Sequence, residues 1–259
     1  MHSEFRTGDA PVSGGDGARV RSNEGSCSVC RILRYEGGSF EACEDSVIQE
    51  YALDIFLNGA LYRSLTCSPW DIEALTAGVL FLDGVISCGA DIESMAFDIA
   101  AGRIDVSVGD AHGVRRIGSG DLSLTPEQVI ECIGALESGS LLFHKTGGVH
   151  SAVLMDSHGV IEAWFEDIGR HSAVDKLVGW SILNDIDPLD KVLVFSGRVP
   201  HEIISKVVAV GWPLVISPGA PTTLSIATAQ EGGTTLVGFA KPHRFNVYSH
   251  AERIALPSA

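Results

Sequence analysis

Apolar residues in the second half of the chain form short runs separated by amphipathic stretches. The runs KVLVF, PLVIS and TTLVGFA have the length and composition of buried strands, and PHEIISKVVAVG and TTLSIATAQEGG between them have helical spacing. This βαβαβ order predicts parallel strands with right-handed crossovers. The preceding stretch SAVLMDSHGVIEAWFED reads as two strands joined at Asp156–Gly159, which adds an antiparallel edge to a mixed sheet with helices on its faces.

The first half reads as a smaller α+β unit. ALDIFLNGALYRSLT predicts a hairpin that turns at Asn58-Gly59, a dipeptide that readily adopts the conformation of tight hairpin turns. A helix is predicted over SPWDIEALTAGVLFLDG, a strand over RIDVSVGD and a second helix over TPEQVIECIGALESG. We therefore divide the chain into a flexible tail at residues 1–25, an N-terminal α+β domain at 26–124 and a C-terminal α/β domain at 125–259.

Three helix starts carry capping signals. Ser68, ahead of a proline, is the expected N-cap of the first helix, and Thr125, again ahead of a proline, is that of the second. In EDIGRHSAVDKLVGW, Ser172-x-x-Asp175 has the spacing of a capping box and predicts a helix over Ala173–Leu183.

The charge is unevenly distributed. The formal net charge is −15, most of the acidic excess lies before residue 140, and all five lysines and seven of the nine histidines follow it. We expect no nucleic-acid partner for so acidic a chain. The apolar runs are too short for a membrane span, and the polar, Gly-rich start lacks the apolar core of a secretory signal. We therefore expect a cytoplasmic protein with reduced thiols and no membrane contact.

Ligands of open α/β sheets bind at the carboxyl ends of the strands. Here four predicted strands are each followed at once by polar residues, in EDIGRH, SGR, PGAPTT and AKPHR. Helix N-termini at the same edge direct N–H groups and partial positive charge toward it, and arginine suits phosphate oxygens. We therefore predict a phosphate-binding rim that comprises Arg170, His171, Ser196, Arg198, Thr222, Thr223, Lys241, His243 and Arg244.

The stretch EDIGRH permits two interpretations. Arg170 could form an ion pair with Glu166 or Asp167, and the charges would then serve the fold alone. Alternatively, the two acids orient Arg170 and His171 toward a ligand. Cations and histidines gathered after several separate strands favour a ligand site, because proteins break local folding rules mostly at functional sites.

HKTGGVHSA is a further candidate segment. Gly147 and Gly148 would allow the backbone to approach a ligand closely. His144, His150 and His171 are candidates for a metal site or a general base, but hydrogen bonding alone is the commoner role. The chain has no His-x-Glu paired with Pro-Cys-x-x-Cys, no Walker A motif and no GxGxxG after a strand, so the zinc deaminase site is absent and we expect no metal.

Together these motifs resemble the FdhD/NarQ family of formate dehydrogenase accessory sulfurtransferases. The similar stretches are, in order, LNG, SPWDIEALTAGVL, DGVIS, HKTGGVHSA, EDIGRHSAVDKLVG, SGR, APTTLSIA and LVGFAKPHRFNVYSHAERI, and the resemblance covers roughly residues 46–256. The resemblance implies a C-terminal domain with a cytidine-deaminase-like α/β fold that lacks the zinc site. It also implies a smaller N-terminal α+β domain, a homodimer and a cytoplasmic location.

The resemblance further implies an activity and its partners. Members of the family take sulfur as a cysteine persulfide from a cysteine desulfurase and pass it to the bis-guanine-dinucleotide molybdenum cofactor, which activates formate dehydrogenase. That cofactor is a bulky polyanion with GDP-like moieties, which suits a cationic rim. The family's cofactor-binding stretch falls here on Phe239, Ala240, Lys241, Pro242, His243 and Arg244, and we expect Arg198, Arg170, His171, His144, Gly147, Gly148 and Thr222 to contribute.

The chain departs from the family at the sulfur-bearing cysteine. The family carries a Cys-x-x-Cys loop between its domains, whereas the corresponding stretch here, Gly113–Gln128, contains no cysteine, and Ile117–Asp121 look like a shortened loop. Persulfide chemistry needs an accessible thiolate. The candidate substitute is Cys27-x-x-Cys30 on a flexible N-terminal segment, where the spacing suits a redox or persulfide pair.

The other cysteines are expected to play ordinary roles. Cys88 reads as a loop thiol near a helix end, and Cys67 and Cys132 fall on or beside regular elements, where they would pack as small hydrophobes. The catalytic residue therefore stays unassigned, with Cys27 and Cys30 as candidates.

Three functions are compatible with these features. The first is an FdhD-type sulfurtransferase, and the second is a cofactor-binding or carrier protein of the same fold that cannot transfer sulfur. The third is an unrelated nucleotide-processing enzyme that uses His144, His150 or His171 as general base. The order of the motifs argues against the third, and the missing cysteine pair leaves the first two open.

Overall fold

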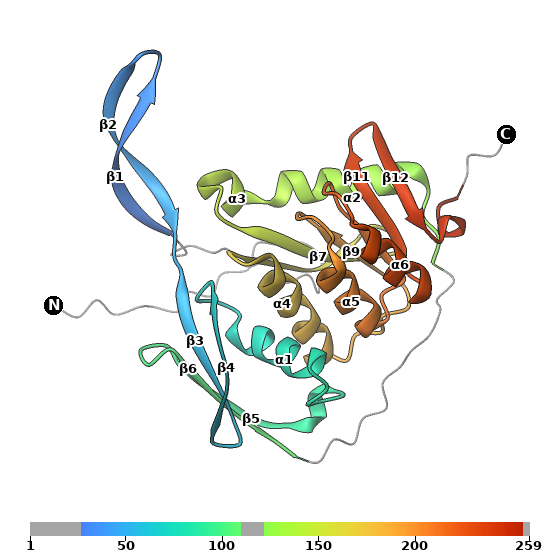
Figure 1. The fold of residues 1–259 in the computed structure, drawn as a ribbon, viewed down its shortest axis with the longest axis horizontal. Coiled ribbons are helices and arrows are strands. Elements are labelled where there is room, and N and C mark those ends of the chain that lie inside the picture. The colour runs from blue at the N-terminus through green and yellow to red at the C-terminus, as the bar shows by residue number, and fades with distance from the viewer. Residues whose placement is uncertain (1–26, 110–121, 256–259) are drawn as a thin grey trace.

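The computed structural model describes residues 27–109 and 122–255 of the 259-residue chain. The predicted tail at residues 1–25 and the shortened loop at Ile117–Asp121 lie outside the described residues. Within the described part, the strands form sheets of two, four and six strands, and helices pack between and around the two larger sheets (Figure 1). The mixed α/β class predicted from the sequence is confirmed.

The six-stranded sheet has the strand order β12-β11-β10-β9-β7-β8. The register pairs β9 with β10 and β10 with β11 in parallel, as the βαβαβ pattern predicts, and β7 and β8 form the predicted antiparallel hairpin. The last strand, β12, pairs with β11 and was not predicted. The strands are β7 (His150–Asp156), β8 (Ile161–Asp167), β9 (Lys191–Phe195), β10 (Leu214–Ile216), β11 (Thr235–Lys241) and β12 (Arg244–Ser249).

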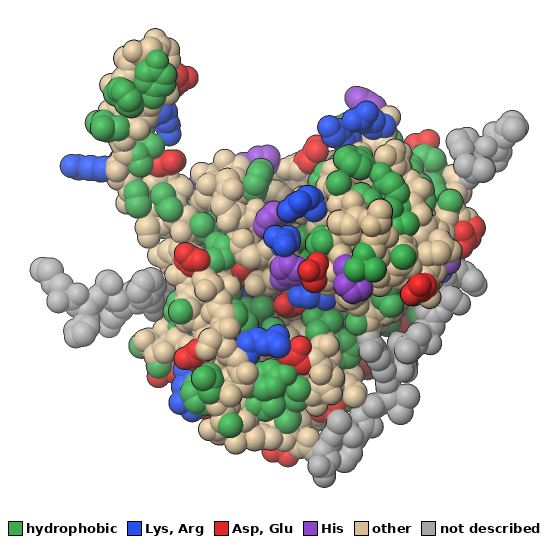
Figure 2. All heavy atoms as spheres, in the orientation of Figure 1, with side chains coloured by type: hydrophobic (Ala, Val, Ile, Leu, Met, Phe, Trp, Pro, Cys, Tyr) green, Lys and Arg blue, Asp and Glu red, His purple; other side chains and the backbone are tan. Residues whose placement is uncertain are grey.

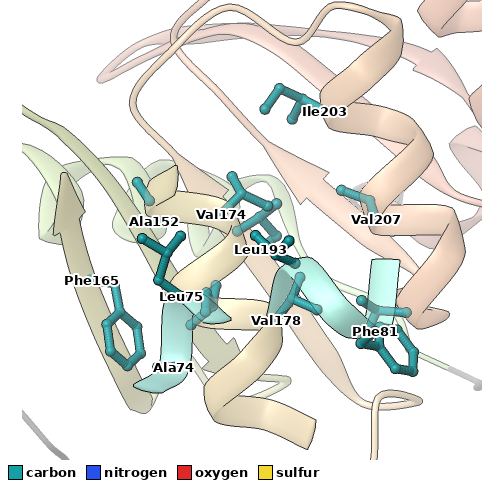
Figure 3. Close-up of a cluster of buried hydrophobic side chains, with 14 of the residues drawn as sticks. Ala74, Leu75, Phe81, Ala152, Phe165, Val174, Val178, Leu193, Ile203 and Val207 are labelled. Carbon is teal, nitrogen blue, oxygen red and sulfur yellow. The ribbon is translucent and has the colours of Figure 1, made fainter. Parts of the chain in front are cut away.

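Helices cover both faces of this sheet. One face packs against α4, α5 and α6 and the other against α2, which is followed by the short helix α3 (Figure 1). Successive residues of the central strands point to opposite faces of the sheet. Leu193 therefore lies in one apolar cluster with residues of α4 and α5 (Figure 3), whereas Val192 and Val194 lie in another with residues of α2. The helices are α2 (Pro126–Gly139), α3 (Leu141–Thr146), α4 (Arg170–Leu183), α5 (His201–Val210) and α6 (Thr223–Glu231).

The four-stranded sheet comes from the first half of the chain and has the order β4-β3-β6-β5. The predicted hairpin is confirmed, and both of its turn residues, Asn58 and Gly59, have positive φ angles of 49° and 85°. The strand β5 was not predicted. The elements are β3 (Tyr51–Leu57), β4 (Ala60–Cys67), α1 (Ile72–Leu82), β5 (Ile92–Asp98) and β6 (Arg103–Val108).

Two glycines bring α1 and α4 into backbone contact. A Cβ atom on Gly78 would lie 1.9 Å from the carbonyl oxygen of Asp175, and one on Gly179 would lie 1.8 Å from that of Ala74. Side chains of α1, α4, β9 and α5 then form one continuous apolar cluster (Figure 3). The proposed boundary at residues 124–125 therefore separates two parts of the chain that share a core.

Two helix starts differ from the prediction. The first helix begins at Ile72 rather than beside Ser68, and its N-cap residue Asp71 has a left-handed conformation without a side-chain cap. The helix α4 begins at Arg170, three residues before the expected start, so that Ser172 lies inside its first turn. By contrast, Thr125 caps α2 as predicted.

The strands β1 (Cys27–Glu36) and β2 (Ser39–Ile48) form a two-stranded hairpin, which we call the arm. The arm projects from the body and was not predicted (Figure 1). Large apolar side chains on one of its faces are exposed: Leu33 is 71% exposed and Phe40 is 72% exposed. Cys27 and Cys30 therefore lie in a regular strand, and not on a flexible segment.

Candidate functional site

The carboxyl ends of β8, β9, β10 and β11 lie along one edge of the six-stranded sheet, which we call the rim. β7 is antiparallel to both β8 and β9, so these two strands run in the same direction, and β10 and β11 are parallel to β9. The first residues of β7 and β12 therefore also reach the rim. This topology places the predicted strand-end residues on a common edge.

A buried ion pair fixes the first part of the rim. Lys176 Nζ lies 2.7 Å from Asp167 Oδ2, and both side chains are fully buried. The other carboxylate oxygen of Asp167 accepts a hydrogen bond from the backbone N–H of Gly169 at 2.8 Å. Asp167 therefore holds the turn that leads into α4, and the expectation that it orients Arg170 or His171 is wrong.

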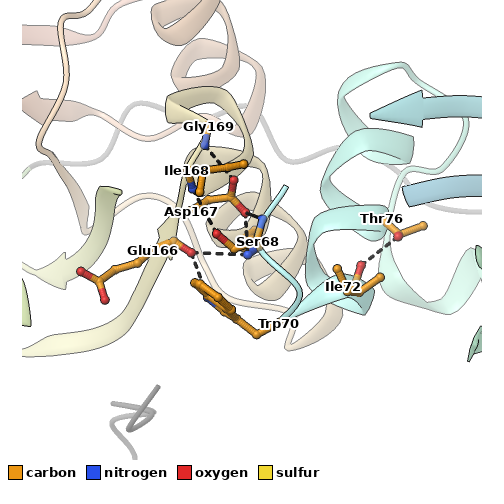
Figure 4. A network of polar contacts seen from close by, with 9 residues as sticks. Ser68, Trp70, Ile72, Thr76, Glu166, Asp167, Ile168 and Gly169 are labelled. Atoms are coloured by element: carbon orange, nitrogen blue, oxygen red, sulfur yellow. Dashed lines mark hydrogen bonds and ion pairs between the residues drawn. The ribbon is translucent and has the colours of Figure 1, made fainter. Parts of the chain in front are cut away.

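The same carboxylate connects the two halves of the chain (Figure 4). The backbone N–H of Ser68 donates to Asp167 at 2.9 Å, and the Ser68 hydroxyl accepts from the N–H of Ile168 at 3.1 Å. The indole of Trp70 donates to the carbonyl oxygen of Glu166 at 3.0 Å. Ser68 lies three residues before the N-cap of its helix, and its hydroxyl is bound to the rim turn instead.

Arg170 does not form the ion pair that the simpler interpretation requires. Within residues 27–109 and 122–255, no salt bridge joins Arg170 or Arg198 to a carboxylate. Glu166 is buried, and its carboxylate accepts a hydrogen bond from the Ser151 hydroxyl at 3.3 Å. Arg198 is exposed in the turn that follows β9. Among the described residues, therefore, neither guanidinium group is paired with a carboxylate.

His150, at the start of β7, occupies the gap between the ends of β8 and β9. Its Nδ1 lies 3.4 Å from the Ser196 hydroxyl, which accepts a 2.9 Å hydrogen bond from the Ser151 N–H. Burial and the neighbouring Arg170 guanidinium lower the pKa of His150, and Asp167 opposes the shift. A Cβ atom on Gly197 would lie 3.4 Å from the imidazole, so the backbone passes close to the ring.

His171 lies on the first turn of α4, where α5 brings further charges close. Burial lowers the pKa of His171, Lys206 and Arg170 lower it further, and Glu202 acts in the opposite direction. Lys206 itself forms an ion pair with Asp175. Both imidazoles are therefore neutral near pH 7 and can accept or donate a hydrogen bond.

Phe239 has an unusual conformation at the other end of the rim. Its φ angle is +51°, and it occupies an irregular part of the β11–β12 pairing. The Phe239 N–H donates to the carbonyl of Gly219 at 3.0 Å, and its side chain is 40% exposed. A positive φ angle at a bulky residue is a costly conformation that occurs mainly at functional sites.

The remaining residues of the predicted cofactor stretch differ in exposure. Ala240 is buried, whereas Lys241, Pro242, His243 and Arg244 form the exposed turn between β11 and β12. In Figure 2, Lys, Arg and His side chains gather at this turn and again near the middle of the visible face, around α4 and α5. The rim therefore carries two groups of cations.

The separation of these groups follows from the sheet order. Four strand spacings of roughly 4.8 Å separate β8, which precedes Arg170, from β11, which ends at Lys241, so this edge is about 19 Å long, and Arg198 follows β9 about half-way along it. A single phosphate cannot contact both ends of this edge. A ligand with two well-separated anionic parts could.

Three residues predicted to contribute to cofactor binding have more limited roles. The Thr222 hydroxyl accepts from the N–H of Ser225 at 3.2 Å and caps α6, although its side chain stays exposed. His144 Nε2 lies 2.6 Å from the carbonyl oxygen of Glu137, which turns the ring toward α2. Gly147 ends α3 with a φ angle of 65°. The structure supports a structural role for each of these residues.

Gly148 connects the rim with the arm. A Cβ atom on Gly148 would lie 2.8 Å from a methyl group of Ile48, the last residue of β2. The base of the arm is thus packed two residues from His150. No sequence pattern predicted this contact, because the arm itself was not predicted.

The cysteines divide into buried and accessible thiols. Burial raises the pKa of Cys67 to about 12 and that of Cys132 to about 11, so neither forms a thiolate readily, and both pack in the core as predicted. Cys30 is exposed, and Cys27, Cys43 and Cys88 are half-buried. Three of the four accessible thiols therefore lie on the arm.

The described residues contain neither a metal-binding cluster nor a membrane-spanning helix. No group of three or more His, Cys, Asp or Glu side chains in residues 27–109 and 122–255 is arranged to hold a metal ion. In the same residues, no helix has the length and apolar composition required to cross a membrane.

Comparison with known proteins identifies the family to which the chain belongs. The model of the FdhD/NarQ family matches residues 107–255. The "Sulfur carrier protein FdhD" of Bacillus subtilis is 34% identical over 260 residues, which covers 90% of this chain and 99% of that protein. The protein of the same name from Staphylococcus haemolyticus is 34% identical and covers 86% of this chain and 95% of its own length. The chain belongs to the FdhD/NarQ family.

A solved structure agrees with this assignment. The crystal structure of a "putative formate dehydrogenase accessory protein" from Desulfotalea psychrophila superimposes with a TM-score of 0.79 at 28% sequence identity. The similarity covers 88% of this chain and 99% of that one. The similarity therefore extends over both larger sheets and not over the α/β body alone.

Proposed function

We propose that this chain is a sulfur-transfer accessory protein for formate dehydrogenase and that it binds the bis-guanine-dinucleotide molybdenum cofactor along the rim. Family membership and the names of its relatives support the first part. The second part rests on one observation, the cations that follow β8, β9 and β11 along about 19 Å of one strand-end edge.

The rim residues fit the phosphate groups of such a ligand. Arg170 and Arg198 have no carboxylate partner among the described residues, and arginine can bind phosphate through two hydrogen bonds. The helices α4 and α5 start at the same edge without side-chain caps, so their first N–H groups face the rim. Lys241, His243 and Arg244 supply the second group.

The exposed ring of Phe239 fits the remaining part of a nucleotide. Aromatic rings stack on bases, and each such contact contributes roughly 1–3 kcal/mol. The β11–β12 pairing is irregular next to Phe239, and bulges of this kind are common near binding sites. Bound cofactor would supply the molybdenum centre that receives the sulfur, while this chain would bind and orient the nucleotide parts.

The partners of this proposal are a cysteine desulfurase as sulfur donor and formate dehydrogenase as acceptor of the sulfurated cofactor. We further propose a homodimer in the cytoplasm. Family resemblance supports each of these points, and size-exclusion chromatography with light scattering would test the dimer.

One observation favours a second candidate, a cofactor-binding carrier that cannot transfer sulfur. The chain has no cysteine between Cys88 and Cys132, which includes the stretch that corresponds to the family's Cys-x-x-Cys loop. Replacing all six cysteines by serine distinguishes the two candidates, provided that the variant keeps its GDP affinity. Sulfur transfer requires a thiol, so a transferase would lose its function, whereas a carrier would keep it.

Restoration of formate dehydrogenase activity tests the proposal. In a strain that lacks its own accessory protein, the wild-type chain should restore activity, and the variant Arg198→Ala/Arg244→Ala should not. The matched control is Arg103→Ala, which removes a guanidinium from β6 of the four-stranded sheet, where it pairs with Asp105. Full activity of the double variant would contradict the proposal that the rim binds the cofactor.

A further inference from the structure

We propose that Ser68 is a positioning residue for the rim, because it holds the turn that places Arg170. The inference rests on the proposed function, since the affinity that it concerns is that of the rim for a nucleotide phosphate. Ser68 belongs to the first half of the chain, whereas every cation that we assign to the rim belongs to the second half. The first half therefore sets the affinity of a site to which it contributes no cation.

Ser68 lies between β4 and α1 and is fully buried. Its backbone N–H donates to Asp167 Oδ2 at 2.9 Å, and its hydroxyl oxygen accepts from the N–H of Ile168 at 3.1 Å. A donor and an acceptor of one residue thus bind two consecutive residues at the end of β8 and just beyond it (Figure 4). This double contact fixes the direction of the backbone at Ile168, which a single hydrogen bond would not do.

Trp70 supports the same turn from a second point. Its indole N–H donates to the carbonyl oxygen of Glu166 at 3.0 Å, and the ammonium group of Lys176 lies 5.0 Å from the centre of the indole ring. The segment that contains Ser68 therefore contacts each residue of 166–168. These contacts cross from the first half of the chain to the second at the point where β8 leads into α4.

The turn determines where Arg170 lies. Gly169 is the N-cap of α4, its N–H donates to Asp167 Oδ1 at 2.8 Å, and its carbonyl oxygen accepts from the N–H of Ala173 at 3.0 Å. Arg170 is the next residue, and no salt bridge joins its guanidinium group to a carboxylate in the part of the chain that the structure describes. The backbone of the turn, and not an ionic partner of the side chain, therefore fixes the position of Arg170.

Replacing Ser68 by alanine removes one of its two contacts with the turn and leaves the other. The backbone N–H remains, so Asp167 keeps this donor as well as its ion pair with Lys176. The hydroxyl group is lost, and the N–H of Ile168 then lacks its acceptor. An amide group without a partner beside a buried side chain is unfavourable. We therefore expect the turn to shift toward another acceptor and Arg170 to move with it.

Isothermal titration calorimetry with GDP tests the inference through a double-mutant cycle. Ser68→Ala should weaken the affinity of the otherwise wild-type chain for GDP about fivefold, which is within the range of coupling between neighbouring residues. In the Arg170→Ala background, the same substitution should change the affinity less than about twofold, because the residue that Ser68 positions is gone. A loss of stability alone would not depend on the presence of Arg170.

The matched control is Ser181→Ala, which removes another buried hydroxyl group. Ser181 lies near the end of α4 that is away from the rim, and its hydroxyl donates to the carbonyl oxygen of Leu177 at 2.8 Å. We expect this variant to bind GDP as the wild-type chain does. Ser68→Cys fills the same space with a thiol, which accepts hydrogen bonds weakly, and it should weaken binding as Ser68→Ala does. Circular dichroism should show that all variants are folded.

The outcomes separate this inference from the proposed function. A wild-type chain that does not bind GDP would overturn the phosphate-binding rim and the role of Ser68 with it. Binding by the wild-type chain with unchanged affinity in Ser68→Ala and Ser68→Cys would overturn the role of Ser68 alone. Equal weakening in the wild-type and Arg170→Ala backgrounds, or an equal effect of Ser181→Ala, would also contradict it.

Discussion

The rim and the arm lie beside each other but are built in different ways. The rim is supported by a two-sided core and by the buried Asp167–Lys176 pair, and it carries the cations. The arm is a two-stranded hairpin whose side chains are largely exposed, and it carries three of the six cysteines. A packed edge that carries the predicted anion site thus contrasts with an exposed hairpin that carries half of the cysteines.

Breaking the buried pair should have the largest effect on stability. Lys176→Met leaves the Asp167 carboxylate buried without its cation, and we expect a loss of about 3–5 kcal/mol in the free energy of unfolding. The corresponding change on the arm, Arg34→Met, breaks an ion pair between half-exposed groups and should cost about 0–1 kcal/mol. Urea denaturation followed by circular dichroism measures both. Equal losses in the two variants would contradict the contrast between rim and arm.

Adding a side chain where α1 and α4 cross should have the next largest effect on stability. Gly179→Ala would place a Cβ atom 1.8 Å from a backbone oxygen, so the helices must separate, at a cost of about 3 kcal/mol or more. The control is Gly134→Ala on α2, where nothing lies within 4 Å, and there we expect a gain of about 0.5–1 kcal/mol. Thermal denaturation of both variants measures whether Gly179→Ala lowers the stability and Gly134→Ala raises it. A stable Gly179→Ala protein would show that the two parts of the chain do not depend on this crossing.

Much of the α/β body was predictable from the sequence, and the reason is physical. Buried parallel strands are apolar on both faces, so KVLVF and TTLVGFA stand out as continuous runs. The hairpin at Asn58-Gly59 was predictable because its turn demands residues that tolerate positive φ angles. These signals are local, and the local structure follows them.

The missed features depend on contacts between distant residues. Ser68 resembles an N-cap, but its hydroxyl binds a turn 100 residues further along the chain. The partner of Asp167 is Lys176, on the second turn of the next helix, and nothing in the spacing distinguishes it from Arg170. The arm was missed because its strands lack the clear inside–outside alternation that burial imposes on strands in a core.

The two rim histidines should make anion binding weakly dependent on pH. Burial and nearby cations lower the pKa values of His150 and His171, so both are neutral near pH 7. A bound phosphate raises these pKa values, so binding takes up protons, and GDP affinity should rise a few-fold as the pH falls from 8 to 6.5. Isothermal titration calorimetry at several pH values measures this dependence.

The matched control for the pH dependence is His150→Gln/His171→Gln, which should bind GDP with a flatter pH profile. The nucleotide phosphate itself titrates near pH 6, so the comparison with the variant isolates the contribution of the protein. Identical profiles for the wild-type and variant proteins would exclude the two histidines from the anion site.

The affinity for GDP tests the central claim, that the strand-end rim is a nucleotide phosphate site. Titration calorimetry should show that Arg198→Ala and Arg244→Ala each weaken GDP binding about tenfold or more, because each removes a charge-assisted hydrogen bond worth about 1.5–3 kcal/mol. Arg34→Ala on the arm should bind GDP as the wild-type chain does. Unchanged affinity in both rim variants would contradict the assignment of the rim.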